Sequence, residues 1–117
     1  MSKAYKLYDV IPNRSTGSIK STCIDVVSRV FRGKEVFVEV RRWDKGYPIK
    51  SVDLAGEIAR EIMMRGIATP NINAKNTVFV GIERDFVVVG YASEEELRLF
   101  EKKALPIEIA RSVIGIV

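Results

Sequence analysis

The residues best suited to bind a ligand gather in one stretch near the middle of the sequence. Arg41 and Arg42 end a valine-rich run, Lys45 follows in a segment without hydrophobic periodicity, and Lys50 stands just before residues with helical spacing. Cations beside the free N–H groups of a helix N-terminus suit phosphate groups. The cluster therefore predicts a site for a phosphate-bearing partner such as a nucleic acid.

Two aromatic residues, Trp43 and Tyr47, are interleaved with these charges. Exposed aromatic rings among basic residues can stack on unpaired bases at single-stranded ends. An alternative is that Arg41 and Arg42 pair with nearby acidic side chains on a solvated edge, while both aromatic rings cap the core. The sequence leaves both interpretations open.

Further along the chain, Lys75 and Asn76 precede a β-branched run and could add a second phosphate contact through a cation and a short amide. An ordinary turn is the alternative interpretation of these two residues. Gly81 and Gly90 fall inside strand-like runs, where glycine indicates a bulge or close packing.

The inventory of reactive side chains argues against an enzyme. The chain has no His, which removes the commonest general base and zinc ligand, and its single Cys23 excludes an intrachain disulfide and a cysteine metal cluster. Neither a spaced carboxylate pair nor a glycine-rich phosphate loop is present. We therefore expect a non-catalytic binding protein without a metal or cofactor.

Composition indicates the charge of the partner, the number of domains, the cellular location and the kind of source organism. The formal charge of +4 favours anionic partners, and the hydrophobic fraction of 47% supplies a core for one domain over residues 1–117. No apolar run reaches the length of a signal peptide or of a membrane span, so we expect a cytoplasmic location. The absence of Gln, with abundant Ile, Val, Glu, Lys and Arg, is typical of a thermophilic source.

The segments that position these residues alternate between strand and helix. Strands are expected over residues 4–11, 36–41, 77–82 and 86–91, with a hairpin turn at 83–85 and a plain connector at 68–71. Helices are expected after Ser15 or Thr16, after Ser51, and over 93–103, the first two of them ended by Gly33 and Gly66. The buried stripe of the second helix should comprise Leu54, Ala55, Ile58, Ala59, Ile62 and Met63.

The order β-α-β-α-β-β-α predicts an α/β fold, a mixed sheet with helices packed on it. The near-continuous apolarity of the two late strands indicates a central position covered by helices on at least one face. Cys23 falls on the apolar stripe of the first helix and should be an inert core residue. An apolar tail over residues 107–117 follows Pro106.

Residues 35–92 resemble the THUMP domain. The matching parts are the basic strand Val38-Glu39-Val40-Arg41-Arg42, the helix entry at Lys50-Ser51 with Leu54, Glu57 and Ile58, and the hairpin from Val78 to Gly90. Residues 1–34 resemble the lead-in strand and helix of THUMP adaptors of tRNA cytidine acetylation, and we expect 93–117 to form a C-terminal helical tail. The family commonly has a Leu-Lys-Asn-Pro-Asp-like turn before the hairpin, of which this chain keeps only Lys75-Asn76.

The resemblance implies a stand-alone tRNA-binding module that presents the acceptor stem and 3′ end of tRNA to a separate modifying enzyme. It would bind RNA through Arg41, Arg42, Trp43, Lys45, Lys50, Lys75 and Asn76. Two alternatives remain. One is a protein-interaction module without RNA affinity, docking or homodimerising through its hairpin or its apolar tail, and the other is an excised domain of a larger tRNA-modifying enzyme.

Overall fold

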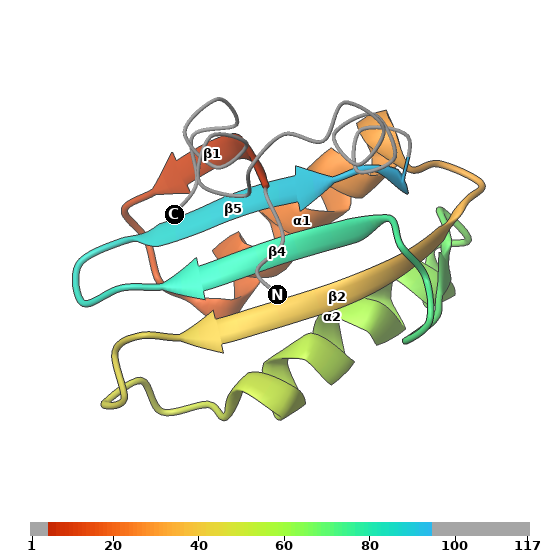
Figure 1. The fold of residues 1–117 in the computed structure, drawn as a ribbon. Helices are drawn as coiled ribbons and strands as arrows, with labels where there is room; N and C mark the ends of the chain where they lie inside the picture. Colours follow the sequence, from red (N-terminus) through yellow and green to blue (C-terminus); the bar gives the residue numbers. More distant parts are fainter. Residues whose placement is uncertain (1–4, 95–117) are drawn as a thin grey trace.

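The computed structural model describes residues 5–94 as a two-layer α/β structure, with a five-stranded sheet and both of its helices on one face (Figure 1). The predicted fold class is confirmed. Neither helix is long and apolar enough to cross a membrane. In chain order the elements are β1 (Lys6–Ile11), α1 (Thr16–Val30), β2 (Glu35–Arg42), α2 (Ser51–Met64), β3 (Thr69–Pro70), β4 (Thr77–Ile82) and β5 (Val87–Ala92).

The strands lie in the order β1-β5-β4-β2-β3. β4 pairs in parallel with β2 and antiparallel with β5, and β1 closes the far edge antiparallel to β5. All six residues of β4 are buried, which confirms the central position predicted for it. Because β2 and β4 run in the same direction, the loop after β2 and the hairpin turn after β4 lie at one end of the sheet.

One short strand was not predicted. Thr69–Pro70 form β3, which pairs in parallel with the start of β2, whereas the sequence indicated a plain connector. The backbone amide of Asn71 donates to the Val36 carbonyl at 2.9 Å and extends this strand pairing by one residue. Two residues that include a proline carry no periodicity, so a strand of this length leaves no signal in the sequence. The helix predicted over 93–103 and the apolar tail 107–117 lie outside the described residues.

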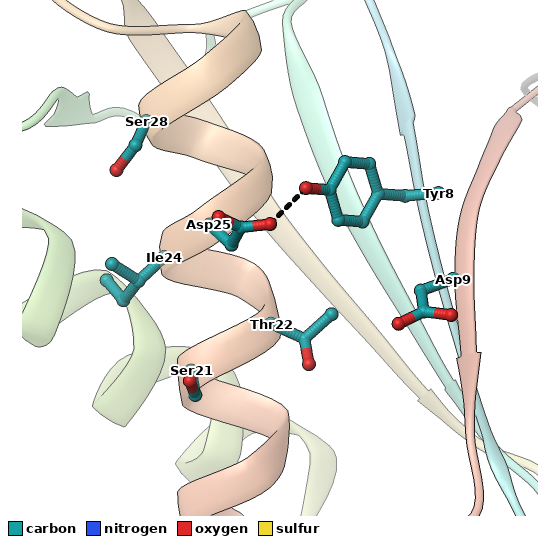
Figure 2. Close-up of a pocket in the computed structure, with 7 residues that line it drawn as sticks. All are labelled: Tyr8, Asp9, Ser21, Thr22, Ile24, Asp25 and Ser28. Carbon is teal, nitrogen blue, oxygen red and sulfur yellow. Dashed lines mark hydrogen bonds between the residues drawn. The ribbon is translucent and has the colours of Figure 1, made fainter.

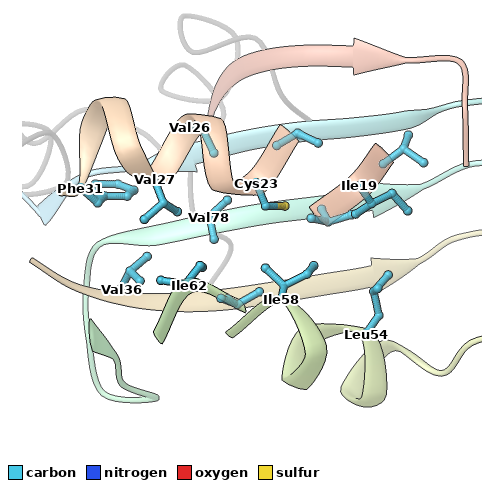
Figure 3. Close-up of a cluster of buried hydrophobic side chains, with 14 of the residues drawn as sticks. Ile19, Cys23, Val26, Val27, Phe31, Val36, Leu54, Ile58, Ile62 and Val78 are labelled. Carbon is cyan, nitrogen blue, oxygen red and sulfur yellow. The ribbon is translucent and has the colours of Figure 1, made fainter. Parts of the chain in front are cut away.

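The main core lies between the sheet and the two helices (Figure 3). α1 begins where the sequence predicted, because the Ser15 hydroxyl accepts a hydrogen bond from the Ser18 amide at 3.2 Å. Cys23 is fully buried on this helix, and burial raises the pKa of its thiol to about 12. The predicted inert cysteine is therefore confirmed. Gly33 and Gly66 follow the two helices with positive φ angles of 75° and 65°.

Two details of α2 differ from prediction. Leu54, Ile58 and Ile62 are fully buried, but Met63 is 62% exposed, because one more residue along the helix turns the side chain about 100° away from the sheet. The predicted cap Ser51 is the first helical residue, and Lys50 occupies the cap position without a side-chain hydrogen bond. Lysine has no acceptor atom, so the first-turn amides of α2 receive no side-chain cap from it.

The difference between neighbouring residues of α2 gives a direct test of the packing. We expect Ile62→Ala to lower the free energy of unfolding by about 2–5 kcal/mol, because it removes a fully buried side chain and leaves a cavity. Met63→Ala is the matched control and should change it by less than about 0.5 kcal/mol. Urea denaturation followed by circular dichroism measures both, and equal losses would contradict the observed orientation of the helix.

Candidate nucleic-acid interface

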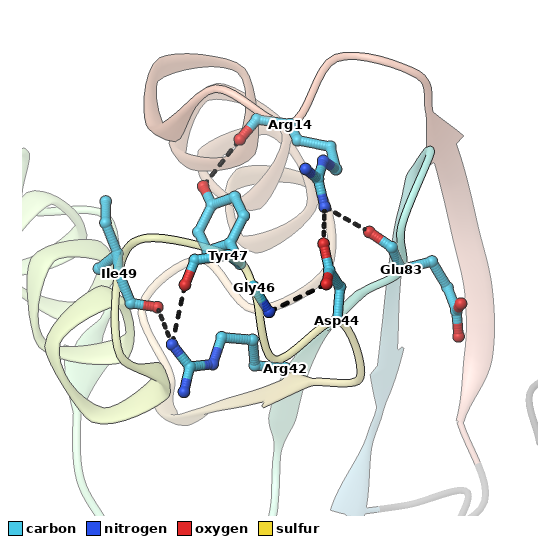
Figure 4. Close-up of polar contacts among 7 residues, drawn as sticks. All are labelled: Arg14, Arg42, Asp44, Gly46, Tyr47, Ile49 and Glu83. Atoms are coloured by element: carbon cyan, nitrogen blue, oxygen red, sulfur yellow. Dashed lines mark hydrogen bonds and ion pairs between the residues drawn. The ribbon is translucent and has the colours of Figure 1, made fainter.

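The end of the sheet where β2 and β4 finish gathers three connecting segments of the chain (Figure 4). The loop of residues 43–50 follows β2, and the turn of residues 83–86 follows β4. The corner of residues 12–15 follows β1, whose Ile11 pairs with Val87 at this same end. α1 and α2 both begin here, so two helix N-termini lie beside the carboxyl ends of two parallel strands. This is the edge where open α/β sheets commonly bind ligands.

Arg42 fixes the loop rather than extending into solvent. Its Nη1 atom donates to the carbonyl oxygens of Tyr47 at 2.9 Å and of Ile49 at 3.4 Å. Tyr47 itself is only 5% exposed and belongs to the main core. The core-capping interpretation is therefore right for Tyr47, and the structure places Arg42 as a support of the loop backbone.

Arg14 is the central residue of this network, although nothing in the sequence around it indicated such a role. Its Nη1 donates to the Asp44 carboxylate at 2.5 Å and to the Glu83 carbonyl at 2.9 Å, while the Tyr47 hydroxyl donates to the Arg14 carbonyl at 2.7 Å. One side chain thus joins the corner, the loop and the turn (Figure 4). These partners lie 30, 69 and 33 positions away in the chain, so no local spacing could reveal the contacts.

The contacts of this network shift the pKa of Asp44. The hydrogen bond from Arg14 lowers the pKa of the Asp44 carboxyl, helped by the Gly46 amide at 3.0 Å and by the nearby charge of Arg84. The carboxylate is therefore ionised at neutral pH, and it anchors the loop by accepting hydrogen bonds from Arg14 and from the Gly46 amide. Arg84 is an exposed residue of the turn that follows β4.

This pKa shift makes the network dependent on pH. A carboxyl whose folded pKa is depressed contributes stability above its unfolded pKa, near 3.9, and loses that contribution as the pH falls through the lower folded value. We expect Asp44→Asn to lower the melting temperature at pH 7, and the difference from the wild type to shrink as the pH falls below about 4. Differential scanning calorimetry from pH 7 to pH 2 measures this, and a difference that is independent of pH would contradict it.

Trp43 lies on the sheet face that carries no helix in the described part of the chain. Its ring packs against Phe79 with a centroid distance of 5.9 Å and crosses Gly81, where an added Cβ would stand 2.5 Å from the indole. Close packing at Gly81 is confirmed, and Gly90 pairs with Leu7 beside a bulge in β1. Trp43 keeps 41% of its surface exposed, so the indole is both seated and accessible.

The contact between Trp43 and Gly81 can be tested by substitution. We expect Gly81→Ala to lift the indole off the sheet, because the new methyl group would occupy the same space. Trp43 is the chain's single tryptophan, so its fluorescence emission should shift to longer wavelength as the ring enters water. Gly56→Ala is the matched control, since its added Cβ would meet nothing within 4 Å, and its emission should match the wild type.

Three exposed cations lie at the same end of the sheet as this ring. The Arg41 side chain is 65% exposed although it pairs with Glu39 at 3.2 Å, so it is ion-paired and accessible at once. Lys45 and Lys50 are exposed, the first in the loop and the second at the start of α2. The structure thus brings Arg41, Trp43, Lys45 and Lys50 to one end of the sheet, with Trp43 on the face without helices and Lys50 at the start of α2 on the other face.

Lys75 and Asn76 lie at the opposite end of the sheet, because they precede β4, roughly 17–20 Å away along the strand. The Asn76 amide donates to the Glu35 carbonyl at 3.1 Å, and its side-chain oxygen accepts from the Glu94 amide at 2.9 Å. Asn76 thus ties strand ends together, while Lys75 is exposed. A contact between RNA and these two residues stays a prediction, separate from the cluster around Trp43.

A hollow of about 410 Å³ between β1 and α1 has a different character (Figure 2). Hydroxyl groups and the carboxylates of Asp9 and Asp25 line it. The Tyr8 hydroxyl donates to Asp25 and lowers the pKa of that carboxyl, which also pairs with Arg29 at 3.1 Å. Within residues 5–94 no three His, Cys, Asp or Glu side chains are grouped closely enough to hold a metal ion.

No protein-family model matches the chain, and no curated protein matches it. Two solved structures share its fold. PH1313 from Pyrococcus horikoshii Ot3 covers 72% of the chain at 13% identity with a TM-score of 0.62. A 4-thiouridine synthetase in complex with RNA and bound ATP covers 74% at 9% identity with a TM-score of 0.61. The chain spans 29% and 23% of those two proteins, and the likeness supports the THUMP-like fold expected from the sequence.

Proposed function

We propose that this protein is a tRNA-binding module that presents the acceptor stem and 3′ end of tRNA to a separate modifying enzyme. The observation that carries the proposal is the seat of Trp43, a partly open indole resting on Gly81 at the end of the sheet that also carries exposed Arg41, Lys45 and Lys50. Cations bind the phosphate backbone, and an accessible ring stacks on a base that is not paired. A duplex stem that ends in a single strand offers both contacts together.

The start of α2 strengthens the electrostatic part of the proposal. Lys50 holds the cap position without a side-chain hydrogen bond, so the first amides of the helix receive no side-chain acceptor there. Such amides and the positive end of the helix dipole favour an anion. A phosphate beside Lys50 would be attracted both by the dipole of α2 and by the Lys50 ammonium group.

The loop that carries Trp43 and Lys45 is held before any ligand arrives. Arg14 and Arg42 tie it to the Glu83 carbonyl and to the loop's own backbone. A pre-organised loop loses less conformational entropy on binding than a free one. This supports a recognition surface rather than a spacer between strand and helix.

The available chemistry supports an adaptor rather than an enzyme. The chain has no His, and its one thiol, Cys23, is buried in the core with a raised pKa. The modification itself would then come from another protein. The 4-thiouridine synthetase that shares this fold was solved in complex with RNA, which supports RNA as the ligand class here.

We expect the protein to bind intact tRNA more tightly than the same tRNA without its 3′ single strand, and more tightly at low salt. Fluorescence anisotropy of labelled tRNA at two salt concentrations measures both effects. Lys45→Ala/Lys50→Ala should weaken binding to both RNAs and reduce the slope of log K against log salt by about 1 for each phosphate that the protein no longer neutralises. Trp43→Ala should weaken binding to the intact tRNA alone by about 5- to 100-fold.

The matched control is Arg32→Ala/Lys34→Ala, which removes the same charge from the exposed turn at the other end of β2. It should leave affinity and salt slope nearly unchanged. Equal losses in the two double variants would show that net charge, and not the end of the sheet near Trp43, governs binding. Failure of the wild-type chain to bind either RNA at low salt would overturn the proposed function.

A further inference from the structure

Exposed apolar side chains lie together on the helix-free face of the sheet, near the end that carries Trp43. Trp43, Phe86 and Val10 are 41%, 38% and 48% exposed. On β5 the core-facing residues are Val87 and Val89, so strand alternation places Val88 on the opposite face. Phe86 directly precedes β5 and accepts a hydrogen bond from the Glu83 amide at 2.9 Å, which continues the hairpin pairing and the alternation by one residue. The indole and the Phe86 ring therefore share one surface.

The register of the strands places Arg41, Gly81, Val88 and Val10 in one row across the sheet, with the Trp43 ring over Gly81 and Phe86 two residues before Val88. Gly81 of β4 pairs with Val88 of β5, and Val88 pairs with Val10 of β1. The indole occupies the space above Gly81, and the half-buried Val88 lies beside it on the neighbouring strand. The surface between the indole and Phe86 is thus apolar.

The backbone positions of Gly81, which seats the indole, and of Phe86 lie at a spacing that suits neighbouring nucleotides. Phe86 stands two residues before Val88, so it lies one strand across and two residues along from Gly81, on which the indole rests. With strands about 4.8 Å apart and residues about 3.3 Å apart, the two positions are separated by roughly 8 Å. The backbone of one nucleotide can span that distance.

The charges on the two sides of this row favour one orientation of a single-stranded RNA segment bound across it. Arg41 and Lys45 stand on the side of β2, whereas Glu83, Arg84 and Asp85 in the turn beside Phe86 carry one net negative charge. Phosphates would therefore face β2, and a base would turn toward the hairpin. Carboxylates there can accept hydrogen bonds from exocyclic amino groups of bases.

We infer that Phe86 is a second stacking platform, so that the helix-free face binds two consecutive unpaired nucleotides, one on Trp43 and the next on Phe86. This rests on the proposed function and deepens it, because it assigns the length and path of the bound single strand. Each stacked base contributes separately to affinity, and sequence preference is weak because every base has a flat face.

The test uses the full chain and one labelled RNA stem carrying zero, one, two or three unpaired 3′ nucleotides. The wild type should gain affinity with the first and again with the second nucleotide. Phe86→Ala should abolish one of these two gains, worth about 5- to 100-fold, and keep the other. Phe86→Leu, which retains apolar bulk without a flat ring, should lose most of the same gain. Ile72→Ala, which removes an 82% exposed apolar side chain elsewhere, should behave as the wild type.

A second measurement identifies the ring that each base meets. Quenching of Trp43 fluorescence reports a base on the indole, and it should persist in Phe86→Ala. If Phe86→Ala matches the wild type at every length, the second platform is wrong while the proposed function stands. If the wild type gains nothing from any unpaired nucleotide, acceptor-end recognition itself fails. Loss of all affinity in Phe86→Ala with an unchanged melting temperature would also contradict two separable platforms.

Discussion

Because β2 and β4 run in the same direction, the chain must return along the sheet between them, and α2 makes that return on the face that buries the core. The parallel pairing therefore brings the loop after β2, the hairpin turn after β4 and the start of α2 to one end. β1 and α1 add their own junction there through the antiparallel pairing of β1 with β5. Neither the position of Trp43 nor the gathering of exposed cations would exist without this pairing.

The face opposite the helices depends on a different constraint, which is the size of one side chain. Gly81 leaves the space into which the Trp43 ring fits, and Phe79 supports that ring while stacking on Tyr5 at 4.6 Å. A central strand normally places a side chain at every second position on this face. Here the space left by the missing side chain holds the ring of Trp43, the residue best suited to stack on a base.

Much of the fold could be predicted because it is encoded by local periodicity. Alternating valines marked β2, the three- and four-residue spacing of apolar positions marked both helices, and glycines marked their ends. The basic cluster was also visible, since its residues are neighbours in sequence. β3 was missed because two residues carry no period, and Met63 was misplaced because the apolar stripe of α2 is narrower than its sequence indicates. Lys75 and Asn76 were grouped with the cluster by residue type, although strand direction places them at the other end.

The role of Arg14 could not be predicted from the sequence, because its hydrogen-bond partners come from distant parts of the chain. This has a consequence for where the functional unit begins. The THUMP resemblance starts near residue 35, yet the side chain that anchors the loop lies at position 14, and β1 is the direct neighbour of β5 in the sheet. A boundary drawn by resemblance therefore does not coincide with a boundary of cooperative structure. The first strand and helix are structural parts of the site, and a fragment that begins at β2 would carry the cations and the indole without the framework that orients them.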